Sequence, residues 1–176
     1  MSRKLLVAVA AFGLLLAACG GTGTGSAEQT VVFIPGYGPN ATPTPATAVP
    51  LGASSRVVTV SLGETDATNM YIHLSSTTVP SGKVSFIVTN KGSKTHEFVV
   101  LSTDTPAADF PIVSFEGEAN RIDEDAKGVT NVGETGDMEP GTSMVLTIDL
   151  KEGHYAVVCN LPGHYAMGMR QDFWVA

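Results

Sequence analysis

Positively charged residues are scarce in this chain of 176 residues, which has 10 Lys and Arg against 17 Asp and Glu. Its formal net charge is −7 at pH 7, and its few basic residues do not form a cluster. Proteins that bind nucleic acid use such clusters to neutralise phosphate groups. We therefore do not expect nucleic acid to be a partner.

Common catalytic motifs are also missing from the sequence. No Gly-rich loop leads into a helical pattern, no Ser lies in a nucleophile elbow, and no segment is repeated. Long amphipathic helical patterns are absent as well. The chain must therefore be understood from short β-type patterns and from a few metal-binding residue types.

The chain has one long apolar run, from Leu5 to Ala18, and it follows Arg3 and Lys4. The run is too short and too poorly flanked for a transmembrane helix, and it is typical of an export signal. It ends in "LAAC", which resembles the lipobox of bacterial lipoproteins. That resemblance implies cleavage before Cys19 and a lipid on Cys19; the alternative is an ordinary secretory peptide with a chance cysteine.

Cysteine is rare, occurring only at Cys19 and Cys159. If Cys19 carries lipid, Cys159 is the single thiol of the mature protein and has no disulfide partner. A lone thiol in an oxidising compartment is open to oxidation or mispairing. We therefore expect Cys159 to be buried or occupied by a ligand.

Composition divides the chain into three parts: a signal peptide at 1–18, a tether at 19–55 and a domain at 56–176. The tether is rich in Gly, Thr, Ser, Ala and Pro, which cannot bury enough apolar area to fold. The run "VVFI" at 31–34 interrupts it and could form a short strand, but we do not count it as part of the domain.

The domain alternates apolar and polar residues with a period of two, in short segments separated by turn-forming residues. This pattern predicts an all-β fold, an antiparallel Greek-key sandwich or barrel. The expected strands lie within residues 56–62, 69–74, 83–90, 96–101, 143–150 and 154–159.

The region from Thr103 to Pro140 breaks this pattern and is rich in Asp and Glu. Long loops in compact domains tend to be functional or partly structured. We interpret this one as a solvated acidic insertion with a possible short helix at 120–127. Its acidic residues, Glu116 to Glu139, could steer a basic partner.

Strand parity brings two metal-binding residues together. His96 shares its parity with Phe98 and Val100, and Cys159 shares its parity with Val157, so both should point inward from strand ends. His164 and a methionine would follow from the next loop. Two imidazoles, a thiolate and a weak thioether are the ligands of blue copper, whereas zinc more often has strong N and S donors without Met.

The stretches "VTNKGSKTHEFVV" and "GHYAVVCNLPGHYAMGM" closely resemble the cupredoxins, the blue-copper proteins of the plastocyanin and azurin type, and especially the exported, sulfocyanin-like ones. The resemblance covers Arg56 to Ala176. It implies one copper ion bound by His96, Cys159 and His164, with a later Met as axial ligand. The usual spacing of four or five residues favours Met169 over Met167.

The resemblance also implies an exposed apolar patch around His164 through which electrons pass. Here the patch would comprise Pro162, Tyr165 and Met167, although ordinary loop packing is the alternative. We expect the other two histidines, His73 and His154, to be ordinary surface residues because their parity opposes that of the core residues.

These features predict a monomeric, membrane-tethered one-electron carrier rather than an enzyme, because protein ligands fill all four positions around the metal. The expected partners are redox proteins, respiratory or cytochrome-type, and the membrane through the lipid anchor. The expected location is the outer face of the cytoplasmic membrane or the periplasm. The alternatives are a copper storage or delivery protein and an accessory subunit of a respiratory complex.

Overall fold

The computed structural model describes residues 29–33, 56–115 and 118–176, which form twelve β-strands and no α-helix. The predicted signal peptide and Cys19 lie outside these residues, as does most of the predicted tether. No helix in the described part is long and apolar enough to cross a membrane.

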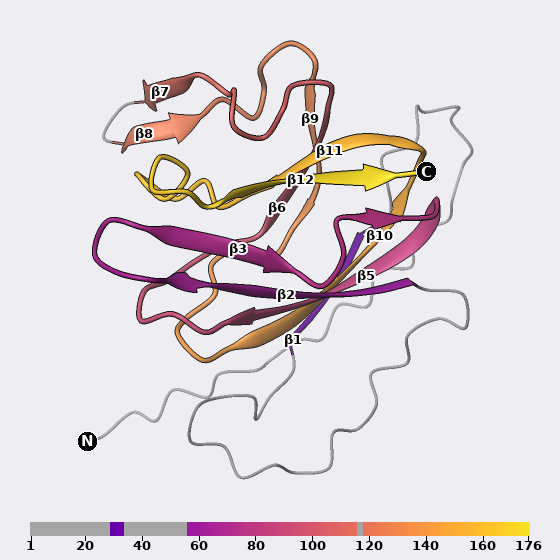
Figure 1. The fold of residues 1–176 in the computed structure, drawn as a ribbon, viewed down its shortest axis with the longest axis horizontal. Coiled ribbons are helices and arrows are strands. Elements are labelled where there is room, and N and C mark those ends of the chain that lie inside the picture. Colours follow the sequence, from indigo (N-terminus) through magenta and orange to yellow (C-terminus); the bar gives the residue numbers. More distant parts are fainter. Residues whose placement is uncertain (1–28, 34–55, 116–117) are drawn as a thin grey trace, which may run out of the picture.

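Two five-stranded sheets lie face to face and form a sandwich (Figure 1). One sheet has the order β1 (Gln29–Phe33), β10 (Ser143–Leu150), β5 (Gly82–Asn90), β2 (Arg56–Glu64), β3 (Met70–Leu74). The other has the order β4 (Thr78–Val79), β12 (Arg170–Val175), β11 (Gly153–Val158), β6 (Val99–Thr103), β9 (Val129–Glu134). A separate hairpin joins β7 (Ile112–Phe115) to β8 (Glu118–Ile122).

The all-β sandwich is confirmed, but its sheets are mixed rather than wholly antiparallel. β2 pairs with β5 in parallel, and β12 pairs with β4 in parallel. The reason is a crossover: after β3 the chain enters the other sheet as β4 and then returns beside β2 as β5. Because the chain passes through the other layer between β3 and β5, β5 runs parallel to β2 instead of antiparallel to it.

The strand β1 lies within the segment predicted to be a tether. It pairs with β10 along its whole length, from Gln29 opposite Ile148 to Phe33 opposite Met144. The first three residues of the run "VVFI", Val31 to Phe33, therefore belong to an edge strand of the sandwich, outside the predicted domain boundary at residue 56.

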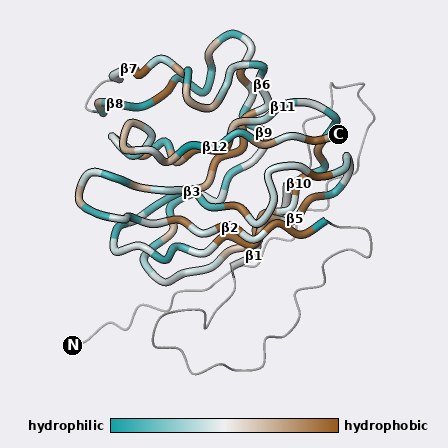
Figure 2. The backbone as a smooth tube through the Cα atoms, in the orientation of Figure 1, coloured by the Kyte–Doolittle hydropathy of each residue, from teal (hydrophilic) through white to brown (hydrophobic). Residues whose placement is uncertain are grey.

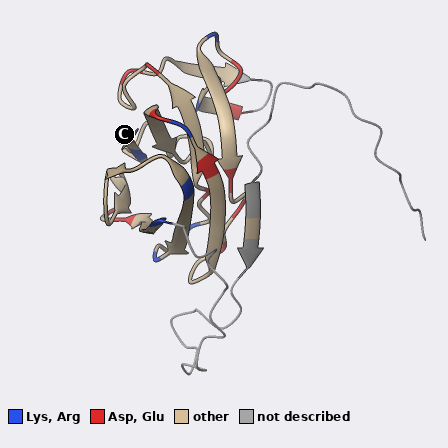
Figure 3. Ribbon diagram, turned by 90° about the vertical axis from the view of Figure 1, so that its right-hand side faces the viewer, with Lys and Arg blue, Asp and Glu red and all other residues tan. Residues whose placement is uncertain are grey.

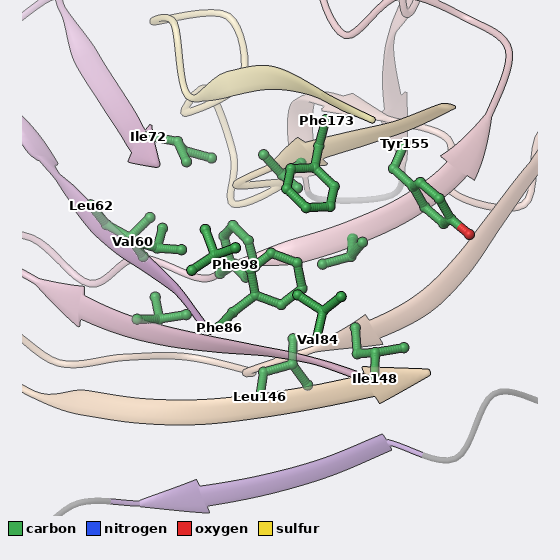
Figure 4. Packing of buried hydrophobic residues seen from close by; sticks show 14 of the residues in the cluster. Val60, Leu62, Ile72, Val84, Phe86, Phe98, Leu146, Ile148, Tyr155 and Phe173 are labelled. Carbon is green, nitrogen blue, oxygen red and sulfur yellow. The ribbon is translucent and has the colours of Figure 1, made fainter. Parts of the chain in front are cut away.

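The main core lies between the two sheets, where the apolar segments of both layers meet (Figure 2). Phe86 of β5 contacts Phe98 with ring centroids 5.2 Å apart and Phe173 of β12 at 5.4 Å (Figure 4). All three rings are fully buried, and burial of such a side chain contributes about 2 kcal/mol. The predicted inward parity of Phe86 and Phe98 is confirmed.

A second, smaller core covers the outer face of β6 and β11. The region from Thr103 to Pro140 provides part of it, because Phe110 and Ile122 pack over Leu101 and Val158. This region therefore contains the β7–β8 hairpin and β9 rather than forming only a solvated flap. The possible helix at 120–127 is wrong, since Glu118–Ile122 is a strand and Asn120 has a φ of 61°.

Because both faces of β11 are covered, the prediction that His154 is a surface residue is also wrong. His154 is buried, and its Nδ1 lies 2.7 Å from the Thr103 carbonyl oxygen. Its Nε2 lies 2.9 Å from Asp172 Oδ1, and its ring packs 4.4 Å from the ring of Trp174. His73, by contrast, is exposed as predicted.

Candidate metal centre

Two neighbouring strands bring His96 and Cys159 to the same end of the sandwich. Cys159 follows β11 directly, and His96 lies three residues before β6, held by an antiparallel bridge to Met138. Since β6 and β11 pair with Val99 opposite Val158, the end of one strand lies beside the start of the other. The predicted meeting of the two residues at one pole is confirmed.

The donor atoms of His96, Cys159 and His164 all lie within 4.8 Å of one another. The two Nδ1 atoms are 3.1 Å apart, and Cys159 Sγ is 3.4 Å from His164 Nδ1. Metal–nitrogen bonds of about 2.0 Å and metal–sulfur bonds of about 2.3 Å place ligands at comparable separations. The three residues therefore fit one shared metal ion.

The loop after Cys159 is closed by its own backbone. The Cys159 amide donates to the Met169 carbonyl (3.1 Å), and the Met169 amide donates to the His164 carbonyl (3.2 Å). The Met70 amide of β3 donates to the Met167 carbonyl at 2.8 Å, which joins the loop to the first sheet. Gly168 has a φ of 109°, and a Cβ there would lie 2.9 Å from the Met70 carbonyl oxygen, so glycine is required.

Burial sets the protonation of the ligands when no metal is bound. It raises the pKa of the Cys159 thiol to about 12, so the thiol is protonated at neutral pH and a metal ion must displace the proton. Burial also lowers the pKa of both His96 and His164. Both imidazoles are therefore neutral and able to offer a lone pair to a metal.

Several polar residues around the ligands were not anticipated from the sequence. Glu64 Oε1 lies 3.0 Å from His96 Nε2. Burial raises the pKa of Glu64, but hydrogen bonds from backbone amides and the electrostatic interaction with His96 outweigh it, so the net pKa is lowered. The available signal was parity, because Glu64 continues the inward series of Val60 and Leu62 on β2.

Glu97 is a second carboxyl group beside the site. Its backbone amide lies 3.4 Å from Cys159 Sγ, and its Oε1 accepts a hydrogen bond from the Asn160 amide at 2.8 Å. Burial raises the pKa of Glu97 to about 7. Asn160 also bonds the β7–β8 hairpin, since its Oδ1 accepts from the Ile122 amide and its Nδ2 donates to the Ile122 carbonyl.

The two candidate methionines differ in exposure. Met169 is fully buried and packs in the main core, whereas Met167 is half-buried at its edge. This difference agrees with the expectation that Met167 covers the surface around the site. The axial role of Met169 stays a prediction.

The predicted apolar patch needs one correction. Pro162 is exposed and Met167 is half-buried, but Tyr165 is only 1% exposed. Its hydroxyl donates to the Ala107 carbonyl (2.9 Å) and accepts from the Phe110 amide (3.1 Å), which places the ring in the second core. Tyr165 therefore cannot form part of a contact surface.

A β-sandwich that places two imidazoles and a thiolate at one end defines a copper-binding domain of the cupredoxin class. Residues 58–176 match the family described as copper binding proteins, plastocyanin/azurin family, and the chain belongs to this family. The predicted cofactor is confirmed: His96, Cys159 and His164 are positioned to bind one copper ion.

Several solved structures are similar to this chain. An auracyanin from Roseiflexus castenholzii is 20% identical, with 67% of this chain and 96% of that chain covered and a TM-score of 0.45. Rusticyanin is 24% identical, with coverage of 69% and 80% and a TM-score of 0.45. Auracyanin A from Chloroflexus aurantiacus is 15% identical, with coverage of 68% and 99% and a TM-score of 0.43. The comparison with curated proteins gives no match.

Proposed function

We propose that this protein is a one-electron carrier built on a type 1 copper site. Copper supplies the redox chemistry, since it cycles between Cu(II) and Cu(I), and a His₂Cys set with a weak axial thioether suits both states. The observation that carries the proposal is the unequal exposure of the ligands. His96 and Cys159 are fully buried, whereas His164 is partly exposed beside the exposed Pro162 and Ala166.

This asymmetry gives electrons a short route while keeping solvent away from the metal. His164 is partly exposed, so a partner can approach the site without entering it. The closed loop from Cys159 to Met169 keeps the ligands in place. The same closure opposes rapid metal exchange, which favours a carrier over a delivery protein, and the filled ligand positions favour a carrier over an enzyme.

The optical spectrum and a redox titration of the copper-loaded protein test this proposal. The oxidised protein should show an intense visible band from thiolate-to-copper charge transfer and should titrate reversibly with one electron. Cys159→Ser should abolish the band, because a hydroxyl oxygen is a harder and poorer donor. A colourless wild-type protein that holds Zn(II) in preference to copper would refute the proposal.

We further propose that the carrier is exported and held by lipid on Cys19, at the outer face of the cytoplasmic membrane or in the periplasm. Its support is the apolar run ending in "LAAC" and the Gly- and Pro-rich segment that follows. One acyl chain binds a membrane only marginally, whereas several chains anchor stably. Cys19→Ala should therefore move the protein to the soluble fraction or leave its signal uncleaved; membrane retention of the cleaved variant would contradict the anchor.

A further inference from the structure

The carboxylate of Glu64 lies against the edge of His96 that faces away from the other ligands. Its Oε1 is 3.0 Å from His96 Nε2, while His96 Nδ1 is 3.1 Å from His164 Nδ1. A neutral imidazole carries its one proton on a single ring nitrogen. A hydrogen bond to the carboxylate keeps that proton on Nε2, which leaves the Nδ1 lone pair free for a metal.

Backbone amides hold this carboxylate in a fixed position. The Ser93 amide donates to Glu64 Oε2 at 2.9 Å, and the Lys94 amide donates to Oε1 at 3.0 Å. Gly92 leaves room for the group, because a Cβ at that position would lie 2.6 Å from Oε2 and 2.9 Å from Oε1. The position of the carboxylate is therefore fixed by backbone donors, independently of His96.

The charge of this carboxylate acts on the metal through its ligand. Glu64 ends β2, and its carboxylate lies within hydrogen-bond distance of the buried, neutral His96. A hydrogen bond from a ligating histidine to a carboxylate makes the imidazole a stronger donor. A nearby negative charge also favours the more positive state of a metal ion. Both effects favour Cu(II) over Cu(I).

We propose that Glu64 is a positioning residue that fixes the tautomer of His96 and lowers the reduction potential of the copper site. The backbone of Gly92, Ser93 and Lys94 holds the carboxylate in that position. This inference rests on the copper site of the proposed function and does not depend on whether the protein acts as a carrier or as a store.

Two variants test the inference through the reduction potential. Glu64→Gln removes the charge and keeps the size of the side chain. Gly92→Ala keeps the charge but forces the carboxylate away from its position beside His96, because all three of the closest atoms to the added methyl group belong to Glu64. We expect both to favour Cu(I) by at least tenfold, an upward shift of about 59 mV for one electron, with the blue band retained.

Glu139→Gln is the matched control. Glu139 is exposed, and its carboxylate accepts a hydrogen bond from Thr95, the neighbour of His96, without contacting His96 itself. It should leave the potential nearly unchanged. An unchanged potential in Glu64→Gln or in Gly92→Ala, or an equal shift in Glu139→Gln, would overturn the inference.

A second measurement needs no variant and no copper. The nitrogen-15 chemical shifts of His96 in the metal-free wild-type protein should show the proton on Nε2. A proton on Nδ1 would overturn the inference even if the variants failed to fold. Failure of the proposed function is distinguishable, because it would appear as a colourless wild-type protein.

Discussion

At the residue scale, the two methionines after His164 have different surroundings although they are two positions apart. Met169 is fully buried, and its backbone closes the loop onto Cys159 and His164. Met167 is half-buried at the rim of the core. The spacing usual in the cupredoxin family favours Met169 as the axial ligand, and this role stays a prediction.

We expect Met169→Leu to keep the blue colour and to raise the reduction potential. Loss of a weak thioether donor destabilises Cu(II) more than Cu(I). Met167→Leu is the matched control and should change the optical spectrum and the potential little. If the Met167 variant shifts the potential and the Met169 variant does not, the axial assignment is reversed.

The orientation of some residues around the site could be predicted from the sequence, and that of others could not. Parity was sufficient to turn His96 and Cys159 inward, because each lies close to the end of a strand with a buried apolar series. It failed for Tyr165, which lies in a loop where no period applies. The partner of that hydroxyl is the backbone of Ala107 and Phe110, more than fifty positions earlier in the chain.

At the element scale, the inner faces of the strands were predictable, whereas the second core was not. Alternation identifies one buried face, but Val99, Leu101, Ala156 and Val158 make the outer faces of β6 and β11 apolar as well. The continuous apolar runs "FVVL" and "YAVV" were the signal for two buried faces. The strand β9 gave little signal, because its sequence "VTNVGE" does not alternate clearly.

The β7–β8 hairpin is joined to the copper loop through Asn160. This side chain exchanges two hydrogen bonds with the backbone of Ile122, at 2.8 and 3.1 Å, as a neighbouring strand would. The Gly163 amide also donates to the Asn120 carbonyl at 3.1 Å. The hairpin therefore helps to hold the loop that carries His164.

We expect Asn160→Ala to lower the free energy of unfolding of the metal-free protein by about 1–3 kcal/mol, because it leaves a buried amide and a buried carbonyl unpaired. Denaturant titration measures this change. Asn69→Ala is the matched control, since Asn69 is exposed and its side-chain amide donates only to the exposed side chains of Asp66 and Thr68. The control variant should lower the free energy of unfolding by less than about 0.5 kcal/mol. Equal losses in the two variants would show that the contact between Asn160 and the hairpin stabilises the protein no more than a surface contact does.

At the scale of the whole molecule, the copper site occupies one pole, and acidic segments lie near it. The loop from Cys159 to Met169 lies at the same end of the sandwich as the β7–β8 hairpin (Figure 1). Asp123, Glu124 and Asp125 lie between β8 and β9, and Glu134 ends β9; Figure 3 shows the Asp and Glu residues of the described chain in red. The composition predicted the acidic character, but only the folded arrangement places it next to the ligand loop.

The apolar surface around His164 consists of the exposed Pro162 and Ala166 and the half-buried Leu161 and Met167, without the buried Tyr165 of the predicted set. A carrier meets its partner briefly, so this contact area should be small and mostly apolar. The neighbouring acids should attract a basic partner over a longer range, and salt should weaken that attraction. A change at the apolar rim should therefore slow electron transfer without touching the metal.

We expect Met167→Lys to slow oxidation of a basic c-type cytochrome by the copper protein on the order of tenfold at low salt, measured by stopped flow. The added lysine places a charge in the apolar contact and repels the basic probe. Val57→Lys is the matched control: Val57 is 43% exposed and lies roughly 20 Å along β2 from Glu64 at the copper pole. It adds the same charge but should leave the rate nearly unchanged, and both variants should keep the wild-type spectrum and copper content. Equal rates of electron transfer for the two variants would contradict the assignment of the contact surface. Equal rates together with rapid copper transfer to an apoprotein would favour a delivery function instead.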